Sequence, residues 1–286
     1  MIEARSLADL EAVRSEWKDR TVAFVPTMGF LHEGHLSLVR KARELGDRLV
    51  VSIFVNPLQF GPDEDFDAYP RDEERDRALL EEEGVDLVFM PTTDVLYPEG
   101  YATHVSVSGG LASGLCGESR PGHFDGVATV VSRLFRLVRP AIAVFGEKDY
   151  QQLMIVRRLT EDLRLSVRVI GYPIVREPDG LAMSSRNMYL DSEQRDQALG
   201  LHRALEAARH LHDQGAEDRR SIEEEIADTL KRHPGIRPQY LAVVDAETLS
   251  PVERLDGRVL VALAGHVSKT RLIDNVVLEP GARGAS

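Results

Sequence analysis

The chain has 286 residues, of which 43% are hydrophobic, and it carries a formal net charge of −12 with one cysteine. Its length accommodates two domains or one large one, and its composition suits a globular core. The acidic balance argues against a general nucleic-acid binder, which needs a basic surface, and one cysteine excludes an internal disulfide framework.

The N-terminal segment leads into a helical pattern with acidic residues near its start. Its apolar residues recur at helical spacing and predict an amphipathic helix; they are Leu7, Leu10, Val13 and Trp17. No apolar run in the sequence approaches membrane-spanning length. We therefore expect a soluble, cytoplasmic chain with neither a membrane nor a nucleic acid among its partners.

From residue 21 to about 175, short apolar runs alternate with helical patterns. Continuously apolar strands separated by helices predict a mostly parallel sheet covered on both faces. The expected fold class is therefore α/β, with a doubly wound, Rossmann-like domain whose ligands bind at the carboxyl ends of its strands. Predicted strands cover 21–25, 48–55, 85–90, 141–145 and 167–170, and predicted helices cover about 34–45, 71–83, 124–138 and 149–163.

The segment 26–35 lies where the first of these strands feeds a helix. Such a turn points backbone N–H groups and the positive helix end at an anion. Gly29 and Gly34 allow the backbone to approach a ligand closely, and His32 and His35 project from one helix face. These features favour phosphate binding. Taken alone, the segment could instead be a metal half-site or an ordinary capped turn, although no H-E-x-x-H or paired-cysteine motif supports a metal.

Two amides, Asn56 and Gln59, follow the second strand. Amides can bind hydroxyls and carboxylates without carrying charge, so both are candidate substrate-binding residues; a turn begun by the Asn-Pro pair is the alternative. The acidic loop 61–72 that comes next lacks the glycine and terminal glutamate of a calcium-binding EF-hand loop. We interpret this loop as a solvated or mobile flap.

The strand that ends near Phe145 delivers Lys148 to the start of another helix. The ammonium of Lys148 can neutralise phosphate charge, and Gln152 lies one helical turn further on, on the same face. A solvated cluster of surface charges is the alternative for this segment.

A turn near Gly180 precedes the loop Met183-Ser184-Ser185-Arg186. The two hydroxyls and the guanidinium can grip the β and γ phosphates of ATP as they separate from the α phosphorus, and a loop can close over the nucleotide. Against the acidic background, a basic pocket is expected from Lys148, Arg186, Arg120 and the two histidines of 26–35.

Beyond Arg186 the pattern changes to two helices and a compact β region, which predict a smaller α+β domain. Asp191 or Ser192 caps the first helix, and Ser221 with Glu224 forms a capping-box pattern for the second. Strands are expected near 238–244, 258–264 and 270–278, with a loose tail over 279–286. We predict a Rossmann-like domain over 1–176, a loop over 177–186 and an α+β lid domain over 187–286.

Five segments together resemble the pantothenate synthetase (pantoate–β-alanine ligase) family, in the family's order and over nearly the whole chain. They are the segments 26–35, 54–61, 120–127, 145–149 and 183–187. The family is similar to the wider HxGH nucleotidyltransferases and to the catalytic domains of class I aminoacyl-tRNA synthetases. One departure from the family's pattern is Phe30, where an alanine is frequent. This difference changes none of the residues that the resemblance assigns to the reaction chemistry.

The resemblance implies a two-step ligase reaction. ATP and pantoate would give an enzyme-bound pantoyl adenylate and pyrophosphate, and the amine of β-alanine would then displace AMP to give pantothenate. The resemblance further implies Mg²⁺ with the ATP and a homodimer.

The resemblance also assigns residues to roles. His35 would be the proton donor, with His32, Lys148, Ser184, Ser185 and Arg186 completing the catalytic set. Gln59 and Gln152 would hold pantoate, beside Asn56, and Asp76 is the candidate metal ligand. The ATP site would comprise Met28, Gly29, Phe30, Leu31, His32, Glu33, Gly34, His35, Gly146, Glu147, Lys148, Asp149, Val175, Met183, Ser184, Ser185 and Arg186.

Three other functions are open to a chain with these motifs. Another HxGH-type nucleotidyltransferase would transfer a nucleotide to a small acceptor. A phosphorylated acceptor would need more Arg and Lys in its binding site, whereas the neutral amides of Gln59 and Gln152 favour a small hydroxy acid. A tRNA synthetase would need an RNA-binding appendage that this short, acidic chain lacks. A nucleotide-sensing module would not need both histidines together with Lys148 and Arg186.

Overall fold

The computed structural model describes residues 1–62 and 64–280. The chain divides into two compact units. Unit 1 comprises Met1–Ser108, Arg120–Glu147 and Gln152–Val175, and unit 2 comprises Gly109–Ser119, Lys148–Gln151 and the chain from Arg176 onward. The expected division into 1–176 and 187–286 stays a prediction, and residues 281–286 of the expected tail lie outside the described residues.

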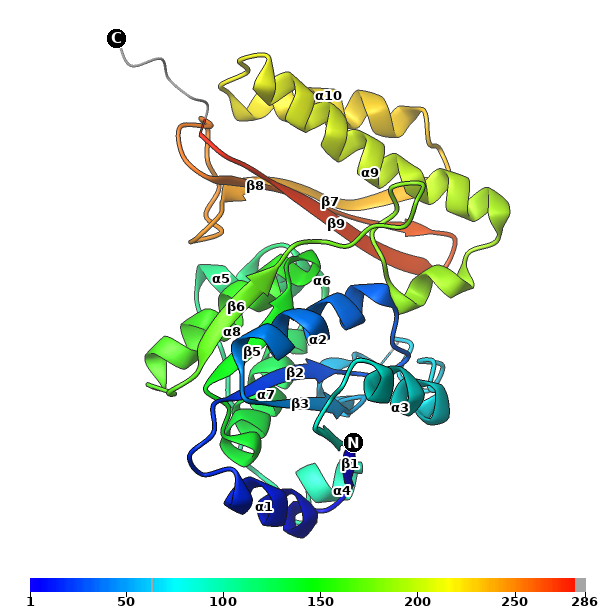
Figure 1. The fold of residues 1–286 in the computed structure, drawn as a ribbon. Helices are drawn as coiled ribbons and strands as arrows, with labels where there is room; N and C mark the ends of the chain where they lie inside the picture. The colour runs from blue at the N-terminus through cyan, green and yellow to red at the C-terminus, as the bar shows by residue number, and fades with distance from the viewer. Residues whose placement is uncertain (63, 281–286) are drawn as a thin grey trace. The chain divides into compact units, whose positions relative to one another are not determined.

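Unit 1 contains, within its described residues, a six-stranded parallel sheet in the order β1-β4-β3-β2-β5-β6 (Figure 1). The predicted doubly wound α/β architecture is present, and all five predicted strands form. The edge strand β1 was not predicted, because a three-residue strand leaves no periodic pattern. The strands are β1 Ile2–Ala4, β2 Val22–Thr27, β3 Arg48–Ile53, β4 Leu87–Phe89, β5 Ile142–Gly146 and β6 Arg168–Tyr172.

Alternate residues of the central strand β2 pack on opposite faces of the sheet. Ala23 and Val25 join an apolar cluster with Val39 of α2, whereas Phe24 makes an edge-to-face contact with Phe135 of α7, at 6.3 Å between ring centroids. Both faces of the sheet are therefore covered, as a continuously apolar parallel strand requires. The helices of this unit include α1 Leu7–Glu16, α2 Glu33–Leu45, α3 Glu73–Glu82, α4 Thr93–Leu96 and α7 His123–Val138, with the short helix η1 Pro57–Gln59.

The first helix carries the tryptophan of the sequence at its carboxyl end. Ser6 caps α1 through a capping box with Asp9, and Trp17 is 6% exposed. The guanidinium groups of Arg14 and Arg48 lie 6.0 Å and 5.3 Å from the centre of the Trp17 ring, within the range of cation–π contacts. Trp17 is thereby built into the packing of unit 1.

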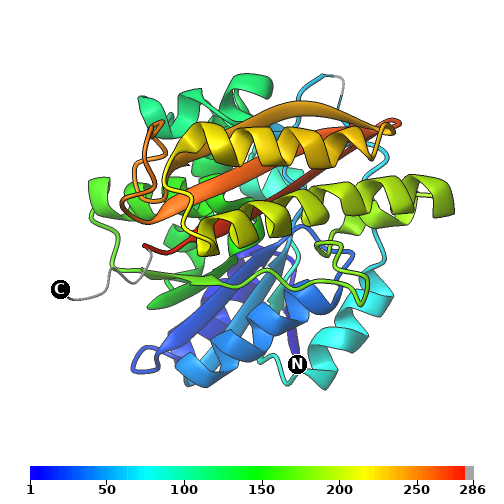
Figure 2. The same cartoon turned by 90° about the horizontal axis from the view of Figure 1, so that it is seen from above.

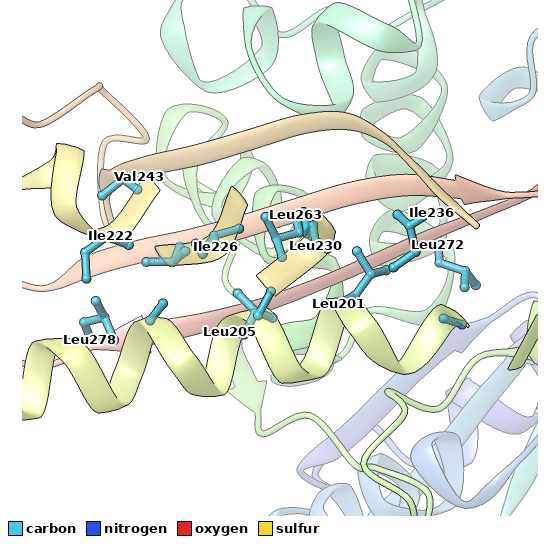
Figure 3. Packing of buried hydrophobic residues seen from close by; sticks show 14 of the residues in the cluster. Leu201, Leu205, Ile222, Ile226, Leu230, Ile236, Val243, Leu263, Leu272 and Leu278 are labelled. Carbon is cyan, nitrogen blue, oxygen red and sulfur yellow. The ribbon is translucent and has the colours of Figure 1, made fainter. Parts of the chain in front are cut away.

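Unit 2 contains, in its described part, an antiparallel sheet of three strands in the order β7-β8-β9. Figure 2 shows two long helices, α9 and α10, lying side by side along this sheet. Their leucine and isoleucine side chains form the core with those of the strands (Figure 3). The elements are α5 Gly110–Ser113, α6 Cys116–Ser119, η3 Ser185–Tyr189, α9 Ser192–Asp213, α10 Arg219–Lys231, β7 Ile236–Asp245, β8 Val259–Val267 and β9 Thr270–Leu278.

One predicted helix start is wrong. The structure confirms Asp191 as the cap of α9, with a capping box to Gln194. For α10, however, the cap is Asp218 and not Ser221, because the Asp218 carboxylate accepts the Ser221 N–H at 2.9 Å. Ser221 is thus the third residue inside the helix. Its hydroxyl also donates to the Asp218 carboxylate, so both side chains lie at the N-terminus of α10.

Candidate active site

The predicted phosphate-binding segment lies at the switch point of the parallel sheet. The chain runs from β2 outward through β3 and β4, and then returns to β5 on the other side of β2. Loops on opposite sides of such a point leave a crevice at the carboxyl ends of the strands, where α/β proteins bind ligands. The loop 28–32 follows β2 and Glu147 follows the neighbouring strand β5, so segments 115 or more residues apart lie at the same edge of the sheet.

The loop after β2 has a left-handed backbone at two consecutive residues, Gly29 with φ +81° and Phe30 with φ +51°. The conformation is uncommon for a residue as bulky as Phe30, so the surroundings must hold it. A Cβ at Gly29 would come within 2.9 Å of Ile53 and 3.0 Å of the Asp76 carboxylate, which explains the glycine.

The carboxylate of Asp76 holds this loop. It accepts the N–H of Phe30 on one oxygen and the N–H of Leu31 on the other, both at 2.7 Å, and it is 1% exposed. Burial raises the pKa of Asp76, although the two N–H bonds oppose that rise. The neighbouring Arg75 donates to the Leu31 carbonyl at 3.0 Å, so α3 supports both sides of the turn. A role for Asp76 as a metal ligand stays a prediction.

The two histidines of the motif lie together at the start of α2. Their ring centroids are 4.1 Å apart, and His35 Nδ1 accepts the backbone N–H of His32 at 3.4 Å. Both side chains are half-buried, whereas Glu33 between them is exposed and paired with Arg40. The hydrogen bond to Arg40 lowers the pKa of Glu33. The imidazoles therefore meet at the positive end of a helix, where a negative charge is stabilised.

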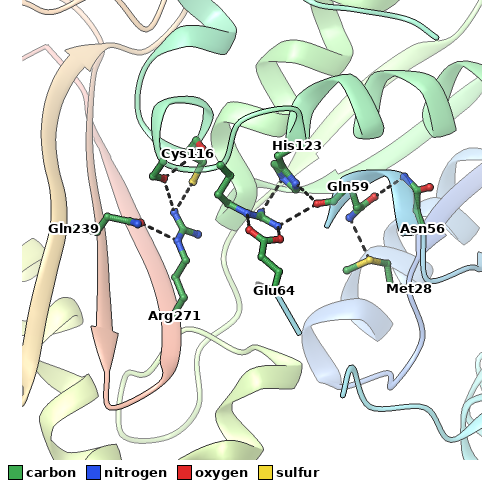
Figure 4. A network of polar contacts seen from close by, with 10 residues as sticks. Met28, Asn56, Gln59, Glu64, Cys116, His123, Gln239 and Arg271 are labelled. Atoms are coloured by element: carbon green, nitrogen blue, oxygen red, sulfur yellow. Dashed lines mark hydrogen bonds and ion pairs between the residues drawn. The ribbon is translucent and has the colours of Figure 1, made fainter. Parts of the chain in front are cut away.

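The two predicted substrate amides have different surroundings. Asn56 is 1% exposed; its NH₂ donates to Gln59 Oε1 and to the Gly126 carbonyl, each at 3.1 Å, and its Oδ1 accepts the Tyr97 hydroxyl at 2.9 Å. Gln59 is half-buried, and its Nε2 lies 3.2 Å from the sulfur of Met28 (Figure 4). Asn56 thus holds Gln59 in place, and a substrate-binding role for Gln59 stays a prediction.

The acidic loop after Gln59 is tied to unit 1 by an ion pair. Arg120 Nε donates to Glu64 at 2.6 Å, and its Nη2 donates to the Gln59 carbonyl, which His123 also contacts at 2.8 Å (Figure 4). Burial alone would raise the pKa of Glu64, but its hydrogen bonds with Arg120 lower it. Interpreting this loop as solvated missed that pair, and Arg120 acts on the protein backbone here.

The segment that carries Lys148 is anchored inside unit 2. Lys148 is half-buried in the short helix η2 Glu147–Asp149, and α8, Tyr150–Asp162, follows at once. Gln151 is 6% exposed; its Nε2 donates to the Leu111 and Gly114 carbonyls at 2.8 Å, and its Oε1 accepts the Cys116 N–H at 2.9 Å. Gln151 holds the segment, while the predicted ligand Gln152 is half-buried in α8.

The loop of Met183 to Arg186 opens the short helix η3. Ser184 caps this helix through the N–H of Arg186, at 3.3 Å, and Ser185 is 6% exposed. Asn187 donates to Glu177 at 2.7 Å and to the Ala182 carbonyl at 3.0 Å, which fixes the loop against the preceding turn. The hydroxyls and the guanidinium are therefore carried by an ordered backbone.

The predicted site residues form two groups. Unit 1 holds Met28 to His35, Asn56, Gln59, Asp76, Gly146, Glu147, Gln152 and Val175; unit 2 holds Lys148, Asp149 and Met183 to Arg186. Sequence reasoning missed the supporting roles of Asp76 and Gln151. The sequence signals that could have indicated these roles were an aspartate on the predicted helix 71–83 and a second glutamine directly before Gln152.

Residues 1–62 and 64–280 contain neither a preformed metal cluster nor a membrane span. No three His, Cys, Asp or Glu side chains in this part of the chain gather as a metal ion requires. No helix there is long and apolar enough to span a bilayer.

Comparisons with known proteins agree with these motifs. A family model described as pantoate-beta-alanine ligase matches residues 3–277. A pantothenate synthetase from Thermotoga petrophila is 54% identical over 261 residues, which cover 91% of this chain and 93% of that protein. The chain belongs to the pantoate–β-alanine ligase family. The family predicted from the sequence is thereby confirmed, and so is its class as an ATP-dependent ligase.

Solved structures of this family share the fold. The crystal structure of pantothenate synthetase from Thermus thermophilus is similar with a TM-score of 0.94 at 50% identity, covering 98% of this chain and 100% of that one. A pantoate–β-alanine ligase from Francisella tularensis, 34% identical, gives a TM-score of 0.80 over 97% of each chain. That ligase was crystallised in complex with beta-gamma ATP and beta-alanine. The predicted fold class is confirmed.

Proposed function

We propose that this chain condenses (R)-pantoate with β-alanine to form pantothenate, using ATP and releasing AMP and pyrophosphate. Membership of the pantoate–β-alanine ligase family over residues 3–277 is the observation that carries this proposal. The loop geometry at the sheet switch point supports it, because the loop presents two imidazoles and a helix start to an anion.

The chemistry requires the acid to be activated first. A carboxylate is a resonance-stabilised anion that an amine does not attack at neutral pH, so we infer that pantoate attacks the α phosphorus of ATP. The P–O bond to pyrophosphate breaks and a mixed anhydride, pantoyl adenylate, forms. The β-alanine amine then attacks the acyl carbon, loses a proton and expels AMP. No protein nucleophile is needed, and the site supplies positioning, cations and N–H donors.

The first step is assigned to residues of both units. His32 and His35 at the start of α2 stabilise the phosphates, with His35 as the proton donor. Lys148 and Arg186 neutralise the charge that develops on the leaving pyrophosphate, and the Ser184 and Ser185 hydroxyls bind its oxygens. We propose that both groups act on one ATP molecule and that the domain predicted over residues 187–286 acts as the lid.

Pantoate is assigned to Gln59 and Gln152. The half-buried amide of Gln59 is held by Asn56 from behind, which leaves a preorganised neutral group for the hydroxyls and carboxylate of a small acid. Asn56 acts through Gln59, because its own amide groups already bind Gly126 and Tyr97.

We propose that Mg²⁺ enters as the complex with ATP. The triphosphate oxygens are ligands that this ion prefers. The donor set of the described residues fits this route, because it offers no cluster of three acidic or histidine side chains and the two Asp76 oxygens already accept N–H bonds. A homodimer and a cytoplasmic location complete the proposal.

The decisive experiment is pantoate-dependent exchange between ATP and labelled pyrophosphate, without β-alanine. We expect exchange only when pantoate is present, followed by AMP release when β-alanine is added. Exchange with a phosphorylated acceptor, and none with pantoate, would favour another HxGH nucleotidyltransferase and overturn the proposal.

A further inference from the structure

Two adjacent polar residues, Asp274 and Asn275, interrupt the apolar pattern of β9. They are 4% and 6% exposed. Side chains alternate along a strand, so Asp274 lies on the face of Leu272 and Leu278, which belong to the apolar core of unit 2. Burying a carboxylate on such a face costs stability unless it is paired, and an apolar residue there commonly does as well or better. The carboxylate therefore calls for an explanation other than stability.

Asp274 binds the base of the turn that precedes the Ser-Ser-Arg loop. Arg176 donates two hydrogen bonds to its carboxylate, at 2.7 Å and 3.0 Å, and donates a third to the Gly180 carbonyl at 3.1 Å. Arg176 also bridges to Ala182, the residue before Met183. The guanidinium of Arg176, paired with Asp274, thus closes the base of the turn. Ser184 follows two residues after Ala182, the other residue of the bridge.

The tip of the same turn fits against α9. Gly180 has φ +98°, and a Cβ there would lie 2.2 Å from the His202 ring. The Glu177 and Asp179 side chains of the turn both bind Arg195, at 2.6 Å and 2.8 Å. With its tip on α9 and its base on Asp274, the turn has a fixed orientation in unit 2.

Asn275 binds the other phosphate-binding segment. Its Nδ2 donates to the backbone carbonyl of Lys148 at 2.9 Å. Its own N–H donates to the Asp274 carboxylate at 2.8 Å, which links the two residues directly. Neighbouring residues of one strand therefore hold the segment of Lys148 from one face of the sheet and the loop of Arg186 from the other.

We propose that Asp274 and Asn275 are positioning residues that set Lys148 and the Ser184–Arg186 loop at a fixed spacing for the triphosphate. This inference rests on the proposed function for the identity of the ligand. Neither residue touches ATP; each acts through a backbone that carries a phosphate-binding side chain. Displacing such a group by about 1 Å can cost about a hundredfold in rate.

Asn275→Ala tests the inference with the full-length chain. We expect ATP–pyrophosphate exchange to fall about 10- to 100-fold. Capture of chemically prepared pantoyl adenylate by β-alanine should change less than about threefold, because that step releases no pyrophosphate. Loss of folded protein would lower both steps equally, so equal losses, or no change in exchange, would overturn the inference. Asp274→Asn should give the same split, and Asp274→Glu should recover part of the exchange.

Affinity for MgATP, measured by calorimetry without pantoate, separates this inference from the proposed function. We expect Asn275→Ala to weaken MgATP binding severalfold and Glu279→Gln to leave it unchanged. Glu279 is the control because it directly follows β9 and its exposed side chain pairs with the exposed Arg258 at 3.0 Å. Wild type that binds MgATP but shows no pantoate-dependent exchange would refute the function alone. An unchanged affinity in both variants would refute the positioning role.

Discussion

The segments predicted to bind phosphate in the two units are held in place by different means. In unit 1 the loop after β2 continues a central strand into α2, and its shape depends on left-handed backbone and close backbone packing. In unit 2 the Ser-Ser-Arg loop follows no strand directly, and ion pairs and amides of side chains fix it. Substitutions that add side-chain atoms should therefore disturb the loop of unit 1 most, and substitutions that remove a polar partner should disturb the loop of unit 2 most.

The largest effect is expected from removing one charged group of each unit. His35→Ala and Lys148→Ala should each lower adenylate formation by about two to four powers of ten, the usual loss for one acid–base or charge-stabilising group. The unfolding midpoint should hardly move for Lys148→Ala, whereas His35→Ala also removes the acceptor of the His32 N–H and should lower the midpoint slightly. Near-wild-type pyrophosphate release by either variant would remove that residue from the mechanism.

Asp76→Asn probes the polar side chain on which the loop of unit 1 depends. An amide can accept only one of the Phe30 and Leu31 N–H groups, and its own NH₂ faces the other. We expect a loss of about 1–3 kcal/mol in unfolding free energy and about a tenfold higher KM for ATP. Asp72→Asn is the matched control, because Asp72 caps the same helix without touching the loop. Equal effects of both changes on KM would contradict a specific role for Asp76.

Gly126→Ala tests the dependence of unit 1 on close backbone packing. A Cβ at Gly126 of α7 would lie 2.1 Å from the Leu58 carbonyl oxygen and 2.6 Å from the Gln59 nitrogen. The helix or η1 must move, at a cost of about 1–3 kcal/mol, and Gln59 moves with it. We expect KM for pantoate to rise severalfold more than KM for ATP.

Gly257→Ala serves as the control for that substitution. Among the described residues other than its two chain neighbours, none has an atom within 4 Å of a Cβ at Gly257. A Gly126 variant whose kinetics match those of the Gly257 variant would show that η1 does not depend on this packing.

The smallest effect is a pH dependence at Asp76. Burial raises its pKa above the usual 3.8, so the folded protein binds this proton more tightly than the unfolded chain does. The contribution of this proton to stability is present below the unfolded pKa and is lost as the pH rises through the folded pKa. Chemical unfolding of wild type and Asp76→Asn at several pH values should show the wild-type advantage shrinking from about pH 4 upward. If the stability advantage of wild type over Asp76→Asn grew with pH, burial would not be the dominant influence on the pKa of Asp76.

Local pattern predicted most of the fold. Each predicted strand of unit 1 and both long helices of unit 2 formed, because apolar periodicity records which face of an element is buried. The start of α10 was misplaced since Asp218 and Ser221 are both cap-forming residues within one turn. The sequence resemblance supplied the site residues by motif, and those assignments remain predictions for the variants above to test.

Pattern could not predict which polar residues support others. Asn56 looks like a ligand-binding amide at the end of a strand, yet its partners Tyr97 and Gly126 come 41 and 70 residues later. Asp274 pairs with a residue 98 positions earlier. Such roles follow from burial and from long-range contacts, which periodicity and spacing along a chain do not encode.

The burial of Trp17 has a practical consequence. It lies in unit 1, within 6.0 Å of two guanidinium groups, and the sequence contains one tryptophan. Intrinsic fluorescence excited at the indole band therefore reports on one half of the molecule, while far-ultraviolet dichroism reports on both. Melting curves recorded by the two signals would coincide for a chain that unfolds as a whole and separate for one whose halves unfold in turn.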